Sequence, residues 1–357
     1  MLQILARVPL YMSFRHFGWP RLLPFSLTIL PSPRCNSRCQ TCNIWKQELD
    51  ELALDEWDRI LTGLGHTPYW FTISGGEPFL YPHLVELVQL AYDRCRPQIL
   101  TLPTNSILYK RIPDMVERIA RYCTDSQVVV NLSLDGVGEK HDQIRGVPGN
   151  FERFEANYAA LRALDLPNLS LGIHSVISRF NVHEIDELFD YAFGLEPDSY
   201  ITEIAEERVE LNTVGLDIAP QPEDYARATA ELTARLQARS FQGFSRITEA
   251  FRIEYYRLVN RILVEKRQVL PCYAGWVSAQ IHADGTVWPC CVRADAMGNL
   301  READYNFRSV WFSDAAQAIR RSIRAKECYC PLANAAYTNM LHHPVTLLRV
   351  GSELVLG

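Results

Sequence analysis

The sequence predicts an α/β protein whose larger part is a partial barrel of six βα units, followed by a small C-terminal domain made of a β-hairpin and a helix. Two observations support this prediction. From Pro24 to about Glu203, short runs rich in β-branched and aromatic residues alternate with longer segments of helical period. Further along, an Asp-Gly turn lies between two cysteine-flanked strands. At 357 residues the chain has room for one large domain and a smaller one.

The six predicted strands are short apolar runs at 26–31, 69–74, 98–103, 127–134, 169–177 and 198–204. The helices predicted between them lie at 54–64, 82–95, 111–123, 149–164 and 182–194. The expected organisation has five parts, which are an amphipathic segment (1–23), the barrel (24–221), a helical connector (222–268), a cysteine-containing domain (269–334) and a tail (335–357).

Composition and charge limit the class of protein. A net charge of -6 provides no general basic field, so nucleic acid is not an expected partner. Ten cysteines without a secretion signal predict a reducing, cytoplasmic location rather than a disulfide framework. The N-terminal segment is apolar but is interrupted by Arg7, Arg15 and Arg21, so it is not expected to cross a bilayer. It is expected either to pack over one end of the barrel or to lie on a membrane surface.

Three cysteines directly after the first predicted strand form the clearest motif. Cys35, Cys39 and Cys42 are spaced CxxxCxxC. Thiolates at this spacing can bind three corners of an iron-sulfur cubane and leave the fourth iron open. The alternative is a zinc site, which prefers four closed ligands, and the next cysteine or histidine along the chain is as far away as His66. The spacing therefore favours an iron-sulfur cluster.

Polar motifs follow the next three predicted strands as well. In a parallel barrel the carboxyl ends of the strands form one rim, where catalytic and binding residues gather. The sequence SGGEP follows the second strand, Thr104 and Asn105 follow the third, and NLSLDG closes the fourth. Arg145 comes shortly afterwards and could bind a carboxylate through its guanidinium.

CxxxCxxC and these motifs, in this order, resemble the radical SAM superfamily over about residues 24–205. The resemblance implies a partial (βα)6 TIM-type barrel and a [4Fe-4S] cluster that binds S-adenosylmethionine (SAM). It also implies reductive cleavage of SAM to a 5′-deoxyadenosyl radical, which abstracts hydrogen from a substrate. The SAM-binding residues that it implies are Gly75, Gly76, Glu77, Pro78, Thr104, Asn105, Ser133, Asp135 and Arg145. One departure is Thr41, where the family commonly has an aromatic residue.

A second group of cysteines lies near the C-terminus. Cys272, Gly285 and Cys290 resemble the opening motif of the SPASM or twitch extension of radical SAM enzymes. That resemblance implies an auxiliary [4Fe-4S] cluster held by Cys272, Cys290, Cys328 and Cys330. Cys291 is the alternative fourth ligand. A zinc site made from the same four thiolates is the other interpretation.

The substrate is less well defined by the sequence. The sixth strand ends with Glu203 near its last residue and runs on into Glu206 and Arg208, and these three are the expected catalytic residues at the rim. An auxiliary cluster favours net oxidation or crosslinking of a small molecule, a peptide or a protein side chain. The short stretch before the first strand makes a leader-peptide recognition domain less expected. A ferredoxin or flavodoxin is the expected low-potential electron donor. The alternative from another class is a zinc-binding structural or scaffold protein without redox catalysis.

Overall fold

The protein is described here by a computed structural model, which covers residues 2–238 and 244–356. One nine-stranded sheet organises the chain, with the strand order β6-β5-β4-β3-β2-β1-β7-β8-β9. The strands β1 to β7 are parallel to one another, whereas β8 pairs antiparallel with β7 and β9 pairs antiparallel with β8. The predicted barrel and the predicted hairpin are therefore parts of the same sheet.

The six βα units are confirmed, and no predicted boundary lies more than three residues from the observed one. Their strands are β1 (Ser26–Ile29), β2 (Trp70–Ile73), β3 (Ile99–Thr104), β4 (Gln127–Ser133), β5 (Leu169–Ile177) and β6 (Ser199–Ile204). The helices that follow β1 to β5 are α2 (Leu54–Leu64), α3 (Leu84–Cys95), α4 (Ile112–Tyr122), α6 (Asn150–Arg162) and α7 (Ile185–Gly194). Short helices also occur in the rim loops, namely η1 (Ile44–Lys46), η2 (Pro78–Leu80) and α5 (Glu139–Arg145).

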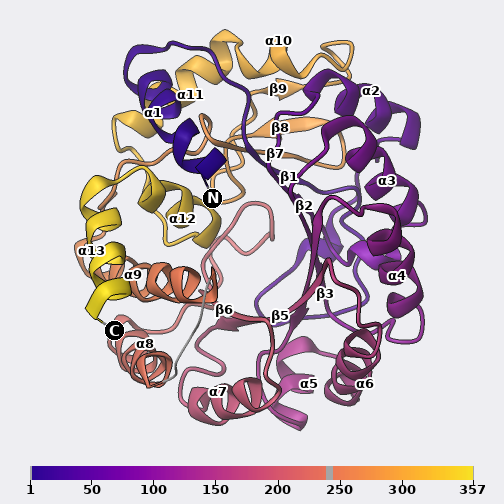
Figure 1. The fold of residues 1–357 in the computed structure, drawn as a ribbon, viewed down its shortest axis with the longest axis vertical. Helices are drawn as coiled ribbons and strands as arrows, with labels where there is room; N and C mark the ends of the chain where they lie inside the picture. The colour runs from indigo at the N-terminus through magenta and orange to yellow at the C-terminus, as the bar shows by residue number, and fades with distance from the viewer. Residues whose placement is uncertain (1, 239–243, 357) are drawn as a thin grey trace.

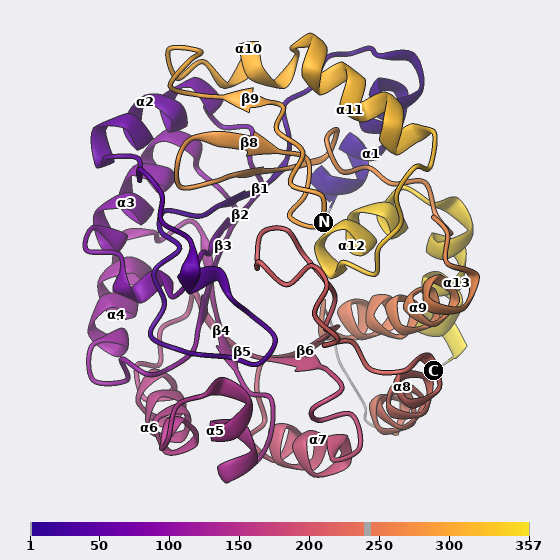
Figure 2. The same cartoon turned by 180° about the vertical axis from the view of Figure 1, so that it is seen from behind.

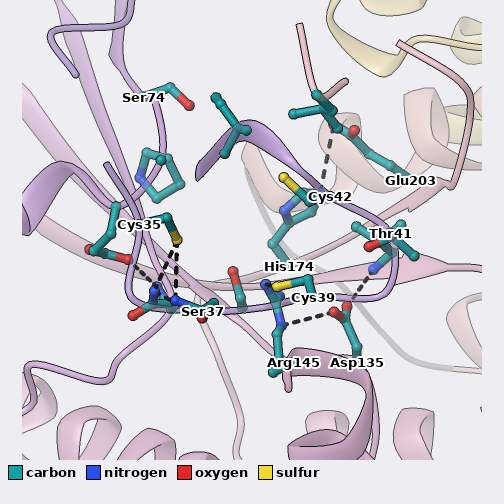
Figure 3. Close-up of a pocket in the computed structure, with 18 of the residues that line it drawn as sticks. Cys35, Ser37, Cys39, Thr41, Cys42, Ser74, Asp135, Arg145, His174 and Glu203 are labelled. Carbon is teal, nitrogen blue, oxygen red and sulfur yellow. Dashed lines mark hydrogen bonds and ion pairs between the residues drawn. The ribbon is translucent and has the colours of Figure 1, made fainter. Parts of the chain in front are cut away.

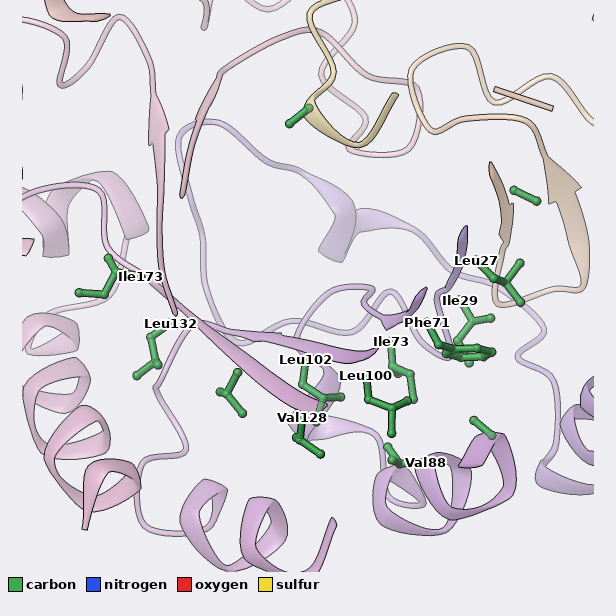
Figure 4. Close-up of a cluster of buried hydrophobic side chains, with 14 of the residues drawn as sticks. Leu27, Ile29, Phe71, Ile73, Val88, Leu100, Leu102, Val128, Leu132 and Ile173 are labelled. Carbon is green, nitrogen blue, oxygen red and sulfur yellow. The ribbon is translucent and has the colours of Figure 1, made fainter. Parts of the chain in front are cut away.

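Alternation along the strands divides apolar from polar side chains. In β4, Val128, Val130 and Leu132 are fully buried against the outer helices. Figure 4 shows this outer layer, which contains buried side chains of β1 to β5 together with Val88 of α3. The intervening side chains of β4 face the barrel interior, and they end with Ser133. The helices therefore bury the apolar face of the sheet, while the interior stays polar enough to hold a site.

The C-terminal part closes the open side of the barrel. After α8 (Pro222–Gln237) and α9 (Phe244–Glu265) the chain returns as β7 (Ser278–Ile281), β8 (Thr286–Trp288) and β9 (Gly298–Asn299). It then forms α10 (Phe307–Trp311), α11 (Asp314–Arg324), α12 (Ala333–Leu341) and α13 (Pro344–Leu356). Figures 1 and 2 show α8, α9, α12 and α13 opposite strands β2 to β4, with the loop after β6 between them. The predicted tail is thus largely helical.

The N-terminal segment forms helix α1 (Leu2–Phe17). Tyr11 and Phe14 of this helix are buried with Phe25, Trp276 and Val277, which belong to β1 and β7 or their flanking loops. The helix therefore packs against the sheet, as the first of the two expected placements requires. In the described part of the chain, no helix has the length and apolar character that a membrane span requires.

Candidate active site

The rim residues predicted from the sequence lie around one cavity of about 210 Å³ at the carboxyl ends of the strands. Figure 3 shows the thiols of Cys35, Cys39 and Cys42 at this cavity, with Asp135 and Arg145 beside Cys39 and Glu203 near Cys42. The predicted residues that line it are Cys35, Cys39, Cys42, Gly75, Gly76, Glu77, Pro78, Thr104, Asn105, Ser133, Asp135, Arg145, Glu203, Glu206 and Arg208. The parallel register produces this convergence, because it brings the ends of β1 to β6 to the same edge.

Two glycines are needed where the loop after β2 meets the cysteine loop. A Cβ atom at Gly76 would lie 2.2 Å from the backbone oxygen of Arg34, and one at Gly75 would lie 2.4 Å from that of Ser32. The close approach allows the Gly76 N–H to bond Ser32 O (3.0 Å) and the Glu77 N–H to bond Arg34 O (2.8 Å). The first structural role of the glycine pair is therefore to seat the cysteine loop on the rim.

Glu77 is a buried carboxylate that organises the rim. Its oxygens accept hydrogen bonds from the Thr104 hydroxyl (2.9 Å) and the Asn105 N–H (2.7 Å). Burial raises the pKa of Glu77 to about 7, although these donors oppose the rise. Asn105 in turn donates to the Asn36 side chain (2.8 Å) and to the Ser37 hydroxyl (3.1 Å). Glu77 and Asn105 thus connect the third strand to the cysteine loop.

Asp135 and Arg145 form a buried ion pair beside Cys39. The Arg145 Nε lies 2.9 Å from Asp135 Oδ2, and its Nη1 lies 3.6 Å from the Cys39 sulfur. Burial would lower the pKa of Arg145, but Asp135 and the neighbouring thiols raise it above its ordinary value. The other Asp135 oxygen accepts the Val176 N–H (2.8 Å). Arg145 therefore presents a fixed positive charge to the cysteine loop.

Two carboxylates and an arginine at the end of β6 and in the loop after it form another wall of the cavity. Arg208 Nη2 lies 3.1 Å from Glu203 Oε2 and 3.3 Å from Glu206 Oε1, and the three side chains are partly exposed, at 9–16%. Burial would raise the pKa of Glu203, but His174 and Arg208 lower it to about 2. Burial raises the pKa of Glu206 to about 7, with Arg208 opposing and Glu203 adding to the rise. Glu203 is thus a permanent anion, whereas Glu206 can change protonation near neutral pH.

His174 and Val176 are pocket residues that the sequence analysis did not single out. His174 Nε2 lies 3.6 Å from Glu203 Oε1 of β6, and the side chains of His174 and Val176 line the cavity from β5. Residues two apart on a strand share one face of the sheet, so His174 lies on the same face of β5 as Gly172 and Val176. This alternation is the sequence signal that could have identified His174 as a residue of the cavity.

The four predicted auxiliary ligands lie near one another outside this cavity. Burial raises the pKa of Cys272 to about 12, and the charges of Cys290 and Cys328 add to the rise. Burial also raises the pKa of Cys330, with Glu206, Cys290 and Cys272 as its next strongest influences. These mutual effects place the four thiols in one electrostatic neighbourhood, and they place Glu206 beside it.

Cys291, the alternative fourth ligand, has different neighbours. Burial raises its pKa, and the next influences are Glu210 and Arg208 rather than Cys272 or Cys328. Its backbone oxygen accepts the Glu210 N–H (3.3 Å), while Leu211 O accepts the N–H of Asn43, next to Cys42. The loop after β6 therefore contacts both cysteine groups. Cys291 is the cysteine of the second group that bonds to this loop.

The donor sets suit clusters better than single ions. Within residues 2–238 and 244–356, no group of three or more His, Cys, Asp or Glu side chains is arranged to hold one metal ion. The first three thiols instead surround a shared cavity. The Cys35 sulfur accepts the Ser37 N–H (3.4 Å), and hydrogen bonds to sulfur are a common feature of iron-sulfur sites. The residues therefore fit a cubane with three protein ligands.

Comparisons with known proteins agree with this geometry. Residues 29–192 match the radical SAM superfamily model, and residues 272–331 match that of SPASM, an iron-sulfur cluster-binding domain. The AdoMet-dependent heme synthase of Methanosarcina barkeri is 26% identical over 82% of each chain. The PqqA peptide cyclase of Bradyrhizobium diazoefficiens is 30% identical over 49% of this chain and 45% of that one. SuiB of Streptococcus suis, solved with S-adenosylmethionine, superposes with a TM-score of 0.65 at 19% identity, covering 87% and 70% of the two chains.

Fold, cysteine sites and matches together define an iron-sulfur enzyme that uses SAM. The chain contains a radical SAM domain over residues 29–192 and a SPASM domain over residues 272–331. Its cofactors are accordingly SAM, the [4Fe-4S] cluster that binds it, and auxiliary iron-sulfur chemistry in the C-terminal domain.

Proposed function

We propose that the protein catalyses a net oxidation or crosslink in which the substrate loses a hydrogen atom, a proton and an electron. The observation that supports this best is the position of Glu206. It lines the SAM-side cavity, and its charge also acts on Cys290 and Cys330 of the auxiliary site. When bound, SAM and its cluster supply a hydrogen-abstracting radical, and the auxiliary cluster supplies an electron acceptor. Glu206 can then take the proton.

The residues of the cavity have distinct proposed tasks. Cys35, Cys39 and Cys42 would hold the SAM-binding cluster, and the Gly75–Pro78 loop with Ser133 and Asp135 would contact SAM. Glu203 holds Arg208 in place, since its carboxylate stays ionised. Arg208 and His174 would orient the substrate. The substrate is a small molecule, a peptide or a protein side chain, and relatives named for heme synthesis and peptide cyclisation support both chemical classes.

Replacing Glu206 with glutamine is expected to separate the two halves of the reaction. An amide cannot accept the proton, so substrate oxidation should fall by about 10²-fold or more, the usual contribution of a positioned base. SAM cleavage should continue. Parallel measurement of 5′-deoxyadenosine and of oxidised substrate in E206Q checks this, with Glu207→Gln as the matched control, because Glu207 binds the Gly215 N–H outside the cavity. Equal loss of both products would contradict the role.

Product formation is expected to rise as the pH passes upward through about 7. Glu206 has a raised pKa, so it is protonated below that pH and becomes able to accept a proton above it. The pH profile of oxidised substrate per deoxyadenosine formed measures this step. In E206Q the rise should disappear, and a rise that persists would assign it to another group.

The proposed reaction also needs an electron donor. A ferredoxin or flavodoxin would provide the low-potential electron for SAM cleavage. A cytoplasmic location is supported by the ten cysteines, all of which are free thiols.

We also infer a peripheral contact of α1 with anionic membranes. Residues 1–47 contain no Asp or Glu, and Phe17 and Trp19 are 84% and 73% exposed.

The expected membrane surface includes a hollow beside α1 that is lined by Arg7, Arg21, Arg308 and His66. Each arginine near an anionic lipid surface contributes about 1 kcal/mol. Replacing both Arg7 and Arg21 by glutamine should therefore weaken binding to phosphatidylglycerol vesicles about 25-fold. Vesicle co-sedimentation at low and high salt measures this, with Arg118→Gln on α4 as the control. Equal binding of all three proteins to phosphatidylglycerol vesicles, or parent binding to neutral vesicles that is just as tight, would contradict the inference.

A further inference from the structure

Two buried arginines donate hydrogen bonds to the loop that carries Cys272. Arg15 of α1 donates from Nε to Cys272 O at 2.9 Å. Arg320 of α11 donates from Nε to Gly275 O at 2.5 Å. The two residues are only 6% and 2% exposed. Helices far apart in the sequence thus supply one positive charge each to the same loop.

Aromatic rings lie next to both of these charges. The Arg15 guanidinium lies 5.1 Å from the Tyr273 ring centre and 5.4 Å from that of Trp276. That of Arg320 lies 4.6 Å from the Trp311 ring centre. Among the described residues neither arginine forms an ion pair with a carboxylate, and both terminal nitrogens of Arg320 lack a hydrogen-bond partner. A buried cation without a counter-ion strongly disfavours folding, so its presence calls for an anion nearby.

The auxiliary site is the available anion. Burial lowers the pKa of Arg15, whereas the neighbouring Tyr273 and Cys272 raise it and Arg324 lowers it further. A third arginine, Arg293, interacts with Cys328 at the other side of the same site, and it also pairs with Asp295. Four thiolates carry more negative charge than a cubane core carries positive charge. The loaded site is therefore a buried anion, with Arg15 and Arg293 acting on its thiols and Arg320 bonded to the loop that carries Cys272.

We propose that Arg15 and Arg320 are positioning residues of the auxiliary site, where their unpaired charges stabilise the bound cluster and raise its reduction potential. The inference rests on the auxiliary cluster of the proposed function, and it specifies how that cluster is made a good electron acceptor. Positive charge close to a cluster favours its reduced, more negative form. It also gives α1 a second task, because this N-terminal helix delivers one of the two charges.

The test uses the full-length chain carrying Cys39→Ala, which leaves the auxiliary cluster as the principal redox centre. Arg15→Met or Arg320→Met is expected to lower the fraction of reduced cluster about tenfold at a given potential, equivalent to a midpoint about 59 mV lower for a one-electron couple. Arg15→Lys keeps the charge and should stay within about threefold of the parent. Arg7→Met also removes a charge from α1. Because Arg7 bonds to Thr67 O and not to the cysteine loop, this variant should leave the midpoint unchanged.

A second measurement separates electrostatics from packing. The iron-free Arg320→Met protein should melt at least as high as the iron-free parent, because an uncompensated buried charge has been removed. An unchanged midpoint in iron-loaded Arg15→Met and Arg320→Met would overturn the inference while leaving the auxiliary cluster intact. A Cys39→Ala parent without iron would overturn the auxiliary cluster itself. Lower melting of the iron-free variants together with an unchanged midpoint would assign the arginines to packing alone.

Discussion

Replacing Cys39 with alanine is expected to abolish cleavage of SAM and to remove roughly half of the bound iron, about four of eight atoms for two cubanes. Two thiolates cannot hold a cubane in place of three, and Cys39 is also the thiol nearest Arg145 (3.6 Å). The loss should be confined to one site, because the auxiliary cysteines lie outside the cavity that Cys39 lines. Anaerobic reconstitution, iron and sulfide content, and chromatography of 5′-deoxyadenosine measure the result.

Cys123→Ala is the matched control for this experiment. Cys123 is fully buried at the end of α4 and lies outside both cysteine groups. Its replacement should keep the full iron content and parental SAM cleavage, with only a modest loss of stability. A Cys39→Ala protein with unchanged iron would show that the triplet does not hold the SAM-binding cluster.

Replacing Gly76 with alanine is expected to reduce SAM cleavage at least tenfold and to weaken retention of the first cluster. The new Cβ would lie 2.2 Å from Arg34 O and 2.4 Å from Pro33 O, well inside any real contact. Both atoms belong to the backbone, so relief requires the cysteine loop to move away from the rim. That movement would break the bond between Glu77 N–H and Arg34 O (2.8 Å). Cluster loss on gel filtration and deoxyadenosine formation are the measurements.

Gly63→Ala is the matched control, because the same change from glycine to alanine is expected to do no harm at this position. Gly63 lies within α2, and a Cβ there would meet only Tyr305 O at 3.8 Å, an ordinary contact. Alanine in a helix interior is favoured over glycine by about 1 kcal/mol, so G63A should be slightly more stable and fully active. A G76A protein that matches G63A in iron content and rate would refute the seating role of the glycine pair.

Local pattern was enough to predict the barrel and its rim. The β-branched runs and helical periods are properties of neighbouring residues, so β5 and α2 could be predicted with their observed boundaries. The cysteine loop and the Gly-Gly-Glu-Pro loop also carry their own signals. Parallel register then brings them together without further information. The chemical roles assigned to the individual residues remain predictions.

Contacts between distant segments could not be predicted in this way. The pairing of β1 with β7 joins residues more than 250 positions apart, as does the bond from Arg15 to Cys272 O. Neither contact has a local sequence signature, because the free energy that stabilises it comes from a segment far away along the chain. On β5, Val176 lines the cavity, whereas its neighbour Ile177 is fully buried in the outer core. The alternation of side chains along a strand explains this difference.

The continuity of the sheet from β1 into β7 has a consequence for how the chain reaches its native state. Ser26 pairs with Ser278, so a strand made early in synthesis must wait for one made late. Until then the edge of β1 that β7 later covers is free, and pairings of such separation form slowly. The half-made chain thus exposes an apolar strand edge next to three reactive thiols. Nascent chains of this protein should depend on chaperones, and cluster insertion should follow completion of the sheet.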